Sequence, residues 1–330
     1  MGKGRLVFRV DGGIQIGLGH LFRCFALAQL LRDNKKIIFC SIDLPASMKT
    51  SFETAGILCH PIKTEKDFFT LIHSKDIVVV DHYLLTTEWQ IKVKGLANKL
   101  ICIDDLNHIE YATDLIINHN PYVLSCEYVA GKNTKFALGF KYAMIRPVFK
   151  QLAASNNLKK TKGEVLICLG GSDNRNITKD IITTVTRIRS NIKLNVVVGQ
   201  AYPFIEDLLK ICRANPNIRL SQGIDSQEMS KLMSRCNVAI VSASGILIEA
   251  LTAKCRIIGC YYANNQKNFH DNLLEENIIL SFGDNSKEFQ RDKLIRCLET
   301  EKKLNLSRIE EYRVEIAQSD GNLRNCINGL

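Results

Sequence analysis

The 330-residue chain lacks the short motifs that mark several familiar enzyme classes. It has no Cys-x-x-Cys pair and no His-x-x-x-His or His-Glu-x-x-His pattern, so we expect no metal site. The Gly-x-Ser-x-Gly nucleophile elbow of α/β-hydrolases is absent. The dinucleotide fingerprint and the P-loop are absent too, because the third glycine and the Gly-Lys-Ser/Thr triplet are missing. Nothing in the sequence indicates a bound cofactor.

Long apolar runs are also missing, since no stretch reaches the roughly 20 residues that cross a bilayer. The N-terminus runs into a predicted strand without a secretory apolar segment. Most of the twelve cysteines lie in apolar strands or helices, and free thiols in a reducing compartment explain them best. We therefore expect a cytoplasmic protein without integral membrane association. The net charge of +10 favours an anionic partner. Its lysines and arginines are scattered and no nucleic-acid motif accompanies them, so a phosphorylated small molecule is the expected ligand.

A chain of this length suggests two domains. Its first half alternates continuously apolar runs with helical segments, which is typical of parallel strands covered on both faces. A polar stretch over 154–163 has the composition of an interdomain linker. The second half repeats the plan and ends in surface helices and a polar tail that we expect to fray. The sequence predicts an α/β protein with two doubly wound domains, 1–153 and 164–330, facing a ligand cleft.

The most informative stretch follows the first predicted strand, Leu6 to Phe8, and runs from Arg9 to His20. Its glycines permit a tight turn and close approach to a ligand. The helix that follows presents free amides, which attract an anion such as phosphate. His20 stands at this positive end, which favours a neutral imidazole able to accept a proton. A purely structural turn with a capping or core histidine would show the same pattern. The glycines are Gly12, Gly13, Gly17 and Gly19.

The second half carries two similar turns. One, over 170–173, follows a predicted strand, and the other, over 242–245, opens a helix that contains Glu249. Amides at such turns can bind a diphosphate, and Glu249 could accept both hydroxyls of a ribose. Asn265 and Gln266 follow a further strand. Taken singly, Glu249 is equally consistent with a solvated helix position, and Asn265 and Gln266 with an ordinary polar loop.

In their order and spacing, these segments resemble the PseG family of nucleotide-sugar hydrolases of pseudaminic acid biosynthesis. The resemblance extends over most of the chain. It rests on Arg9–Gly13, Gly17–His20, Arg23–Cys24, Val80–Tyr83, Ile103–Asp105, Ile117–Asn120, Leu138–Gly139, Tyr142, Arg146–Pro147, Leu169–Asp173, Ser244–Gly245, Glu249 and Asn265–Gln266.

The resemblance implies the GT-B fold of MurG-type glycosyltransferases, with two Rossmann-like domains. It implies hydrolysis of UDP-2,4-diacetamido-2,4,6-trideoxy-β-L-altropyranose to the free sugar and UDP, without a metal. His20 would be the catalytic base that activates water, and Tyr83 would lie near the sugar. UDP would be held mainly by the C-terminal domain. The implied substrate-binding residues are Asp11, Gly12, Gly13, Gly17, Gly19, Gly171, Ser172, Ser244, Gly245, Glu249, Asn265 and Gln266.

Two other functions stay open at this point. A MurG-like glycosyltransferase would use His20 to activate an acceptor hydroxyl, and the basic, aromatic segment 63–75 offers it a docking patch for a lipid acceptor. A non-catalytic nucleotide-sugar binding protein would bind the same ligand without turnover.

Overall fold

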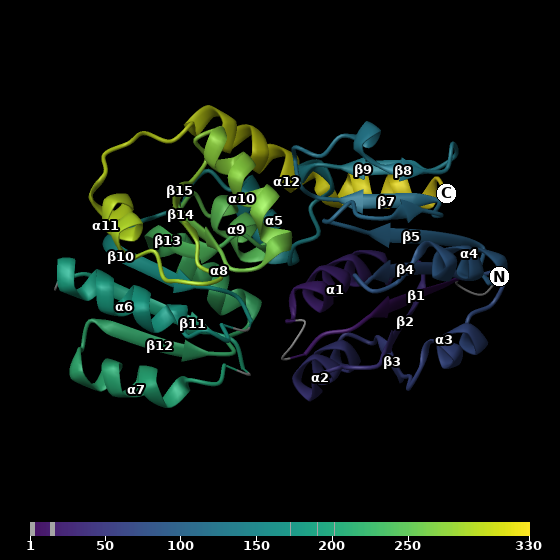
Figure 1. The fold of residues 1–330 in the computed structure, drawn as a ribbon, viewed down its shortest axis with the longest axis horizontal. Coiled ribbons are helices and arrows are strands. Elements are labelled where there is room, and N and C mark those ends of the chain that lie inside the picture. Colours follow the sequence, from purple (N-terminus) through teal and green to yellow (C-terminus); the bar gives the residue numbers. More distant parts are fainter. Residues whose placement is uncertain (1–3, 14–16, 172, 190, 201) are drawn as a thin grey trace. The chain divides into compact units, whose positions relative to one another are not determined.

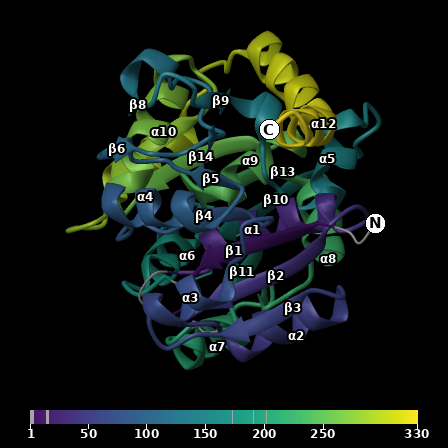
Figure 2. The same ribbon diagram turned by 90° about the vertical axis from the view of Figure 1, so that its right-hand side faces the viewer.

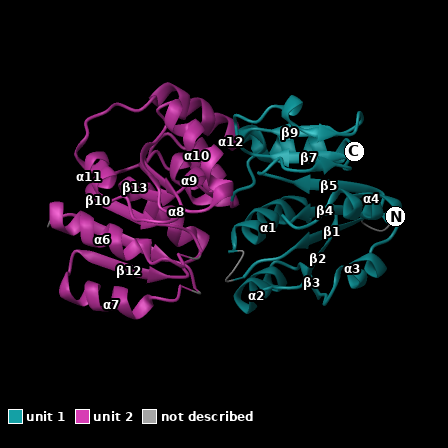
Figure 3. Ribbon diagram, viewed as in Figure 1, with its two compact units in different colours: residues 1–145, 318–330 teal, residues 146–317 magenta. Residues whose placement is uncertain are grey.

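The computed structural model describes residues 4–13, 17–171, 173–189, 191–200 and 202–330. The chain divides into two compact units (Figure 3). Unit 1 comprises residues 1–145 and 318–330, and unit 2 comprises residues 146–317. Each unit is built on its own parallel sheet with helices between successive strands.

In the described residues of unit 1, seven strands form one sheet in the order β3-β2-β1-β4-β5-β7-β9, with every neighbouring pair parallel (Figure 1, Figure 2). These strands are β1 (Arg5–Val10), β2 (Lys36–Ser41), β3 (Leu58–Pro61), β4 (Ile77–Asp81), β5 (Lys99–Ile103), β7 (Leu115–Asn118) and β9 (Lys135–Leu138). A short parallel pair, β6 (Glu110–Tyr111) and β8 (Val129–Ala130), lies outside this sheet. The helical elements are α1 (Gly19–Leu31), α2 (Ala46–Thr54), α3 (Glu65–Leu71), α4 (Thr87–Leu96) and the 3₁₀ turns η1 (Ser125–Glu127) and η2 (Phe140–Tyr142).

The strands of unit 1 are apolar along most of their length because both faces of the sheet are covered. On one face, Leu6 and Phe8 of β1 share a buried core with Leu21 of α1. On the other face, Val7 shares a second core with Val78 of β4. Burial of each such side chain stabilises the fold by about 1.5–3 kcal/mol, which explains the continuous apolar runs in the sequence.

Unit 2 repeats this plan, with six strands among its described residues in the order β12-β11-β10-β13-β14-β15, again all parallel. The strands are β10 (Thr161–Cys168), β11 (Lys193–Val198), β12 (Ile218–Gln222), β13 (Cys236–Ser242), β14 (Arg256–Tyr261) and β15 (Leu280–Asp284). The helices are α5 (Pro147–Ala154), α6 (Ile177–Ile188), α7 (Ile205–Ala214), α8 (Ser226–Arg235), α9 (Gly245–Thr252), α10 (Asn264–Glu275), α11 (Arg291–Glu299) and α12 (Leu306–Asn328). The predicted α/β class with two doubly wound sheets is confirmed.

Each sheet has a point at which the order of its strands reverses, next to its first strand. In unit 1 this point lies between β1 and β4, and in unit 2 it lies between β10 and β13. Ligands of open α/β sheets bind at the carboxyl ends of the strands at such a point. The fold therefore draws attention to the loops that follow these four strands.

The two units divide the chain differently from the predicted domains 1–153 and 164–330. Unit 1 ends at Ile145, and helix α5 packs against α8 and α9 of unit 2 with Phe149 fully buried. The segment 154–163 is therefore not a linker between the units, and β10 already begins at Thr161. The segment 154–163 has the polar composition of a linker because it includes the first residues of β10, which are exposed to solvent.

The predicted frayed tail is also replaced by helix, since α12 continues to Asn328. Residues 318–330 join unit 1 because Leu323 and Ile327, four positions apart, are buried in the same core as Leu6 and Phe8. Only two buried apolar positions mark this last segment among many polar ones, so its composition alone does not reveal the packing.

All twelve cysteines are free thiols, and five of them are buried in strands, in line with the expectation that most lie in apolar strands or helices. These are Cys40, Cys102, Cys168, Cys236 and Cys260. In segment 63–75, Phe68 is fully buried and stacks on Trp89, and Phe69 packs against the same ring. These aromatic side chains are thus part of the core of unit 1 and not an open docking patch. Among the helices that the structure describes, none combines the length and apolar character needed to cross a bilayer.

Candidate functional site

The glycine-rich turn of unit 1 leads from β1 to the start of α1, where His20 is the second residue of the helix and is buried. Gly13 and Gly17 exchange backbone hydrogen bonds of 3.2 and 2.8 Å, which closes the turn. Gly17 has a φ of 82°, a conformation that favours glycine. Residues 14–16 lie outside the described part of the chain. The turn thus places an imidazole at the amino end of a helix, as the sequence predicts.

Asp81, the last residue of β4, holds the ring of His20. Its Oδ1 lies 2.5 Å from Nδ1 of His20. An ionised carboxylate only accepts, so Nδ1 donates its proton to Asp81, and Nε2 is the acceptor in the neutral form of the ring. Nη2 of Arg23 lies 3.2 Å from the same Nδ1, which cannot also accept a hydrogen bond from it in this tautomer. Burial alone would raise the pKa of Asp81, but the charge of Arg23 and the bond to His20 hold that pKa well below its usual range.

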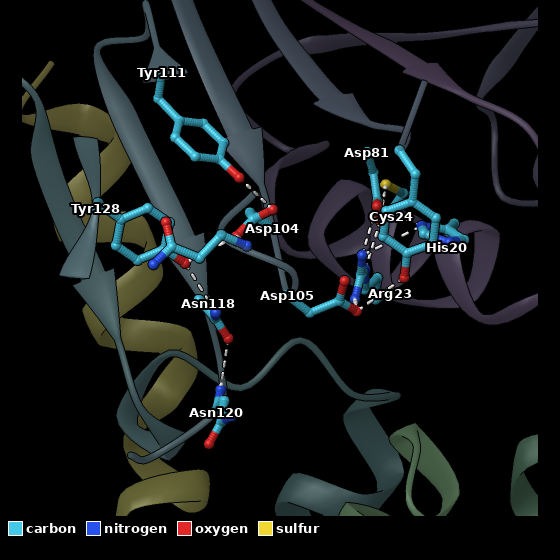
Figure 4. Close-up of polar contacts among 12 residues, drawn as sticks. His20, Arg23, Cys24, Asp81, Asp104, Asp105, Tyr111, Asn118, Asn120 and Tyr128 are labelled. Atoms are coloured by element: carbon cyan, nitrogen blue, oxygen red, sulfur yellow. Dashed lines mark hydrogen bonds and ion pairs between the residues drawn. The ribbon is translucent and has the colours of Figure 1, made fainter. Parts of the chain in front are cut away.

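Arg23, one turn further along α1, lies between two carboxylates (Figure 4). Its Nε and Nη2 donate to Asp81 at 2.6 Å each, and its Nη1 donates to Asp105 at 2.8 Å. Tyr83 donates its hydroxyl to the same oxygen of Asp105 at 3.1 Å, and its ring meets that of His20 edge-on, with centroids 4.6 Å apart. Burial, followed by the negative charge of Asp105, raises the pKa of Tyr83, so the phenol stays protonated. This favours a positioning role for Tyr83 over proton transfer.

Asp11 directs its carboxylate into the protein. Its oxygens accept from the backbone amides of Ile42 and Asp43 at 2.7 and 3.2 Å, and lie 2.9 Å from Arg9 and 3.2 Å from His82. Burial would raise the pKa of Asp11, but these donors lower it to about 2. The carboxylate ties together the loops that follow β1 and β2. A direct contact with substrate stays a prediction.

A Cβ at either of the first two glycines of the turn would require a neighbouring side chain to move. A Cβ at Gly12 would lie 2.4 Å from Cδ1 of Leu21, and one at Gly13 would lie 2.0 Å from Oδ2 of Asp43. A Cβ at Gly19 would meet nothing within 4 Å. The sequence pattern alone does not distinguish these positions.

In unit 2, the corresponding turns follow β10 and β13. Gly170 has a φ of 95°, and Gly171 continues the turn, whereas Ser172 lies outside the described residues. Ser242 donates to the carbonyl of Leu169 at 3.0 Å and lies 3.1 Å from the hydroxyl of Ser244. Helix α9 begins at Gly245, which is exposed, and its first amides have no side-chain cap. This end of the helix can therefore accept an anion.

Glu249 is buried in α9 and not solvated. Both of its oxygens accept from Arg146, at 2.8 and 2.5 Å. Ribose hydroxyls would have to use the remaining lone pairs of this carboxylate. Asn265 and Gln266 lie in the first turn of α10, where Oε1 of Gln266 accepts from the backbone amide of Tyr262 at 3.1 Å. The structure thus places six predicted residues of unit 2 either in the turns after β10 and β13 or within α9 and α10, and it adds Arg146 just before α5. The six are Gly171, Ser244, Gly245, Glu249, Asn265 and Gln266.

The sequence analysis missed the pairings that organise the site. Asp81, Arg23, Asp105 and Arg146 all fall in motifs of the family resemblance, but no role follows for them from the sequence. The available signal was their position. Asp81 ends β4, Asp105 follows the neighbouring strand β5, and Arg23 stands three residues after His20 on one helix face. Among the described residues, no group of three or more histidine, cysteine or acidic side chains is arranged to hold a metal ion.

Comparison with solved structures defines the class of fold. Acinetobacter baumannii MurG matches with a TM-score of 0.58 and 12% identity, covering 99% of this chain and 100% of that one. Medicago truncatula UGT71G1, complexed with UDP-glucose, matches with a TM-score of 0.62 and 13% identity, covering 98% of each chain. At such identities the likeness shows the fold alone. The chain has the GT-B fold of these glycosyltransferases, as the resemblance implies.

The sequence relationship is more particular. The UDP-2,4-diacetamido-2,4,6-trideoxy-β-L-altropyranose hydrolase of Campylobacter jejuni is 28% identical over 275 residues, which cover 80% of this chain and 93% of that protein. No protein-family model matches the chain. The resemblance indicated by the motifs is confirmed, and the chain is a relative of this hydrolase.

Proposed function

We propose that the protein is an enzyme that hydrolyses the anomeric C1–O bond of a UDP-linked 2,4-diacetamido-2,4,6-trideoxy sugar, releasing the free sugar and UDP. The observation that carries this proposal is the buried His20, oriented by Asp81 at the reversal point of the first sheet. The similarity to a hydrolase of such a substrate supports the choice of reaction.

In this mechanism, Nε2 of His20 removes a proton from water while the water oxygen attacks C1. The bond from C1 to the phosphate oxygen breaks, and its electron pair leaves with UDP. Asp81 stabilises the imidazolium that forms, at an Nδ1–Oδ1 distance of 2.5 Å. UDP is already a good leaving group, so the reaction needs a base and stabilised phosphate charge more than an acid.

The diphosphate is proposed to bind the amides at the start of α9 and at the Gly170–Gly171 turn, where Ser172 would also contribute. Glu249, Asn265 and Gln266 would hold the nucleoside. Asp11 and the glycine turn of unit 1 would border the sugar beside Tyr83. We propose that no metal takes part, and that a single displacement inverts C1. The twelve free thiols agree with a cytoplasmic location.

The test is incubation with the UDP-linked diacetamido-trideoxy-altrose in ¹⁸O-water, with mass spectrometry of the products. His20→Asn and UDP-N-acetylglucosamine serve as controls, and a parallel sample contains EDTA. We expect the label in the free sugar, an inverted anomer trapped at early times, no effect of EDTA, and loss of turnover in the variant. Label in UDP would mean attack at phosphorus and would refute the mechanism.

The same experiment separates the competing functions. Turnover only after addition of an acceptor would assign the chain to the glycosyltransferases whose fold it shares. Tight binding of the UDP-sugar without turnover, unchanged in His20→Asn, would indicate a binding protein. The burial of Phe68 and the packing of Phe69 remove one support for a lipid-docking transferase.

A further inference from the structure

Two consecutive aspartates follow β5 and enter different networks (Figure 4). Asp104 is buried and satisfied, since the hydroxyls of Tyr111 and Tyr128 donate to it at 2.7 and 3.0 Å and the backbone amide of Asn107 donates at 2.9 Å. These hydrogen bonds hold in place the segments that contain β6 and β8. Asp104 therefore has a structural explanation.

Within the part of the chain that the structure describes, Asp105 is satisfied at one of its two oxygens only. Its Oδ2 accepts from both Arg23 and Tyr83, but its Oδ1 is buried without a hydrogen-bond partner among the described residues. An unsatisfied buried oxygen costs about 1–3 kcal/mol. The contacts that the charge of Asp105 does make, to Arg23 and Tyr83, therefore show where it acts.

The role of Asp105 follows from the guanidinium between the two carboxylates. Arg23 makes two bonds to Asp81 and one to Asp105, and Asp81 in turn holds His20. The positive charge of Arg23 opposes protonation of the adjacent imidazole, and a carboxylate on the far side of Arg23 offsets part of that charge. The effect on His20 thus depends on Asp105.

We propose that Asp105 is a positioning residue that sets the basicity of the His20–Asp81 pair by holding Arg23. This inference rests on the hydrolase function proposed above. It assigns to Asp105 an effect on the pH dependence of the reaction, without any contact between Asp105 and the substrate.

Three titratable groups around the pair, Tyr83, Cys24 and His119, stay uncharged near neutral pH. Tyr83 keeps its proton, as described above. Burial raises the pKa of the Cys24 thiol well above its usual value, and this thiol lies 3.5 Å from Asp81. Burial and the charge of Arg23 lower the pKa of His119, at the end of β7, to about 4. On the other side of β4, the charge of Asp11 is matched by Arg9.

Replacement of Asp105 by asparagine removes the charge that offsets Arg23. Protonation of His20 becomes harder, so the acidic limb of the kcat/KM profile moves to lower pH. A direct neighbour shifts such a titration by about 1–3 units, and Asp105 acts one guanidinium further away, so we expect about 0.5–1 unit. The value of kcat/KM at the high-pH plateau falls about threefold to tenfold, because a weaker base accepts the proton of water less readily.

The experiment measures kcat/KM for UDP release between pH 5 and 9 in the wild type, Asp105→Asn and Asp104→Asn. The second variant is the matched control, because it removes the same charge from the adjacent residue, which has no bond to Arg23. We expect a downward shift in Asp105→Asn only. An unmoved limb, or equal shifts in both variants, would overturn the proposal.

Tyr83→Phe provides a second test, useful if Asp105→Asn does not fold. It removes a donor from Asp105 without a change of charge, which leaves Asp105 more effective against Arg23, so the limb should move slightly to higher pH. An unmoved limb or a shift to lower pH would contradict the inference. Absence of hydrolysis in the wild type would instead refute the proposed function, which keeps the two failures apart.

Discussion

Replacement of Asp81 by asparagine tests the centre of the proposed mechanism. Asparagine keeps the size of the side chain but removes the negative charge 2.5 Å from Nδ1 of His20. Two unit charges about 4 Å apart interact by about 4 kcal/mol at an effective dielectric constant of about 20. That energy stabilises the imidazolium in the transition state, so its loss corresponds to a decrease of roughly 10³ in kcat/KM. An amide can also turn its NH₂ group toward the ring and select the wrong tautomer, which acts in the same direction.

Asp81→Asn also weakens the partners of the partly buried Arg23, so a loss of stability must be separated from a loss of catalysis. Asp76 provides the control, because it stands just before the opposite end of β4, is equally buried, and pairs with Arg5 at 3.1 Å. We expect Asp76→Asn to lower the Tm by a similar amount with nearly unchanged kcat/KM. The assay is UDP release below the Tm of each variant. Equal decreases in kcat/KM for both variants, or less than tenfold for Asp81→Asn, would refute the role given to Asp81.

Three further predictions concern single positions. Gly12→Ala should destabilise unit 1 by about 1–3 kcal/mol in urea unfolding, because its Cβ would fall 2.4 Å from Cδ1 of the fully buried Leu21, whereas Gly19→Ala should be nearly neutral. The pKa of Asp11 is lowered to about 2 in the folded protein. Its ionised carboxylate therefore adds about 2 kcal/mol to the free energy of unfolding above pH 4, and this contribution is lost as the pH falls from about 4 to about 2. Asp11→Asn should therefore flatten the pH dependence of the unfolding free energy in that window, and an unchanged slope would contradict the low pKa. Glu249→Gln should weaken UDP binding about tenfold by calorimetry, and a lower Tm with unchanged affinity would restrict Glu249 to a structural role.

The sequence predicts much of this fold because hydrophobic periodicity is a local signal. Continuous apolar runs such as Ile77–Asp81 identify parallel strands, and the repeat of the pattern after residue 164 identifies a second sheet. The packing of residues 318–330 on unit 1 could not be predicted, because it depends on where Leu323 and Ile327 are buried after the sheet has formed. Two buried side chains in a polar segment do not produce a recognisable hydrophobic periodicity in the sequence.

The candidate site divides in the same way. A glycine turn before a helix is a local motif, so His20 could be singled out from the sequence. The partners of His20 come from other strands, and their identity depends on which strand lies next to β1. Both β2 and β4 lie next to β1 in the sheet, and the sequence does not indicate that the last residue of β4 is the one that contacts the imidazole. The role of Arg146 could not be predicted for a similar reason, because its partner Glu249 lies in α9, about a hundred residues away in the sequence.

Strand register then decides which of two adjacent carboxylates serves the site. Ile103 pairs with Ile117, and the backbone amide of Asp104 donates to the carbonyl of Ile117 at 3.0 Å, so Asp104 continues the ladder. Its side chain enters the tyrosine network, and that of Asp105 turns to Arg23. Since successive side chains of an extended segment alternate in direction, a slip of one residue would exchange the two aspartates. The apolar run Leu100–Ile103, buried throughout, resists that slip. The core of unit 1 thus supports the electrostatics of the site by fixing the register of β5.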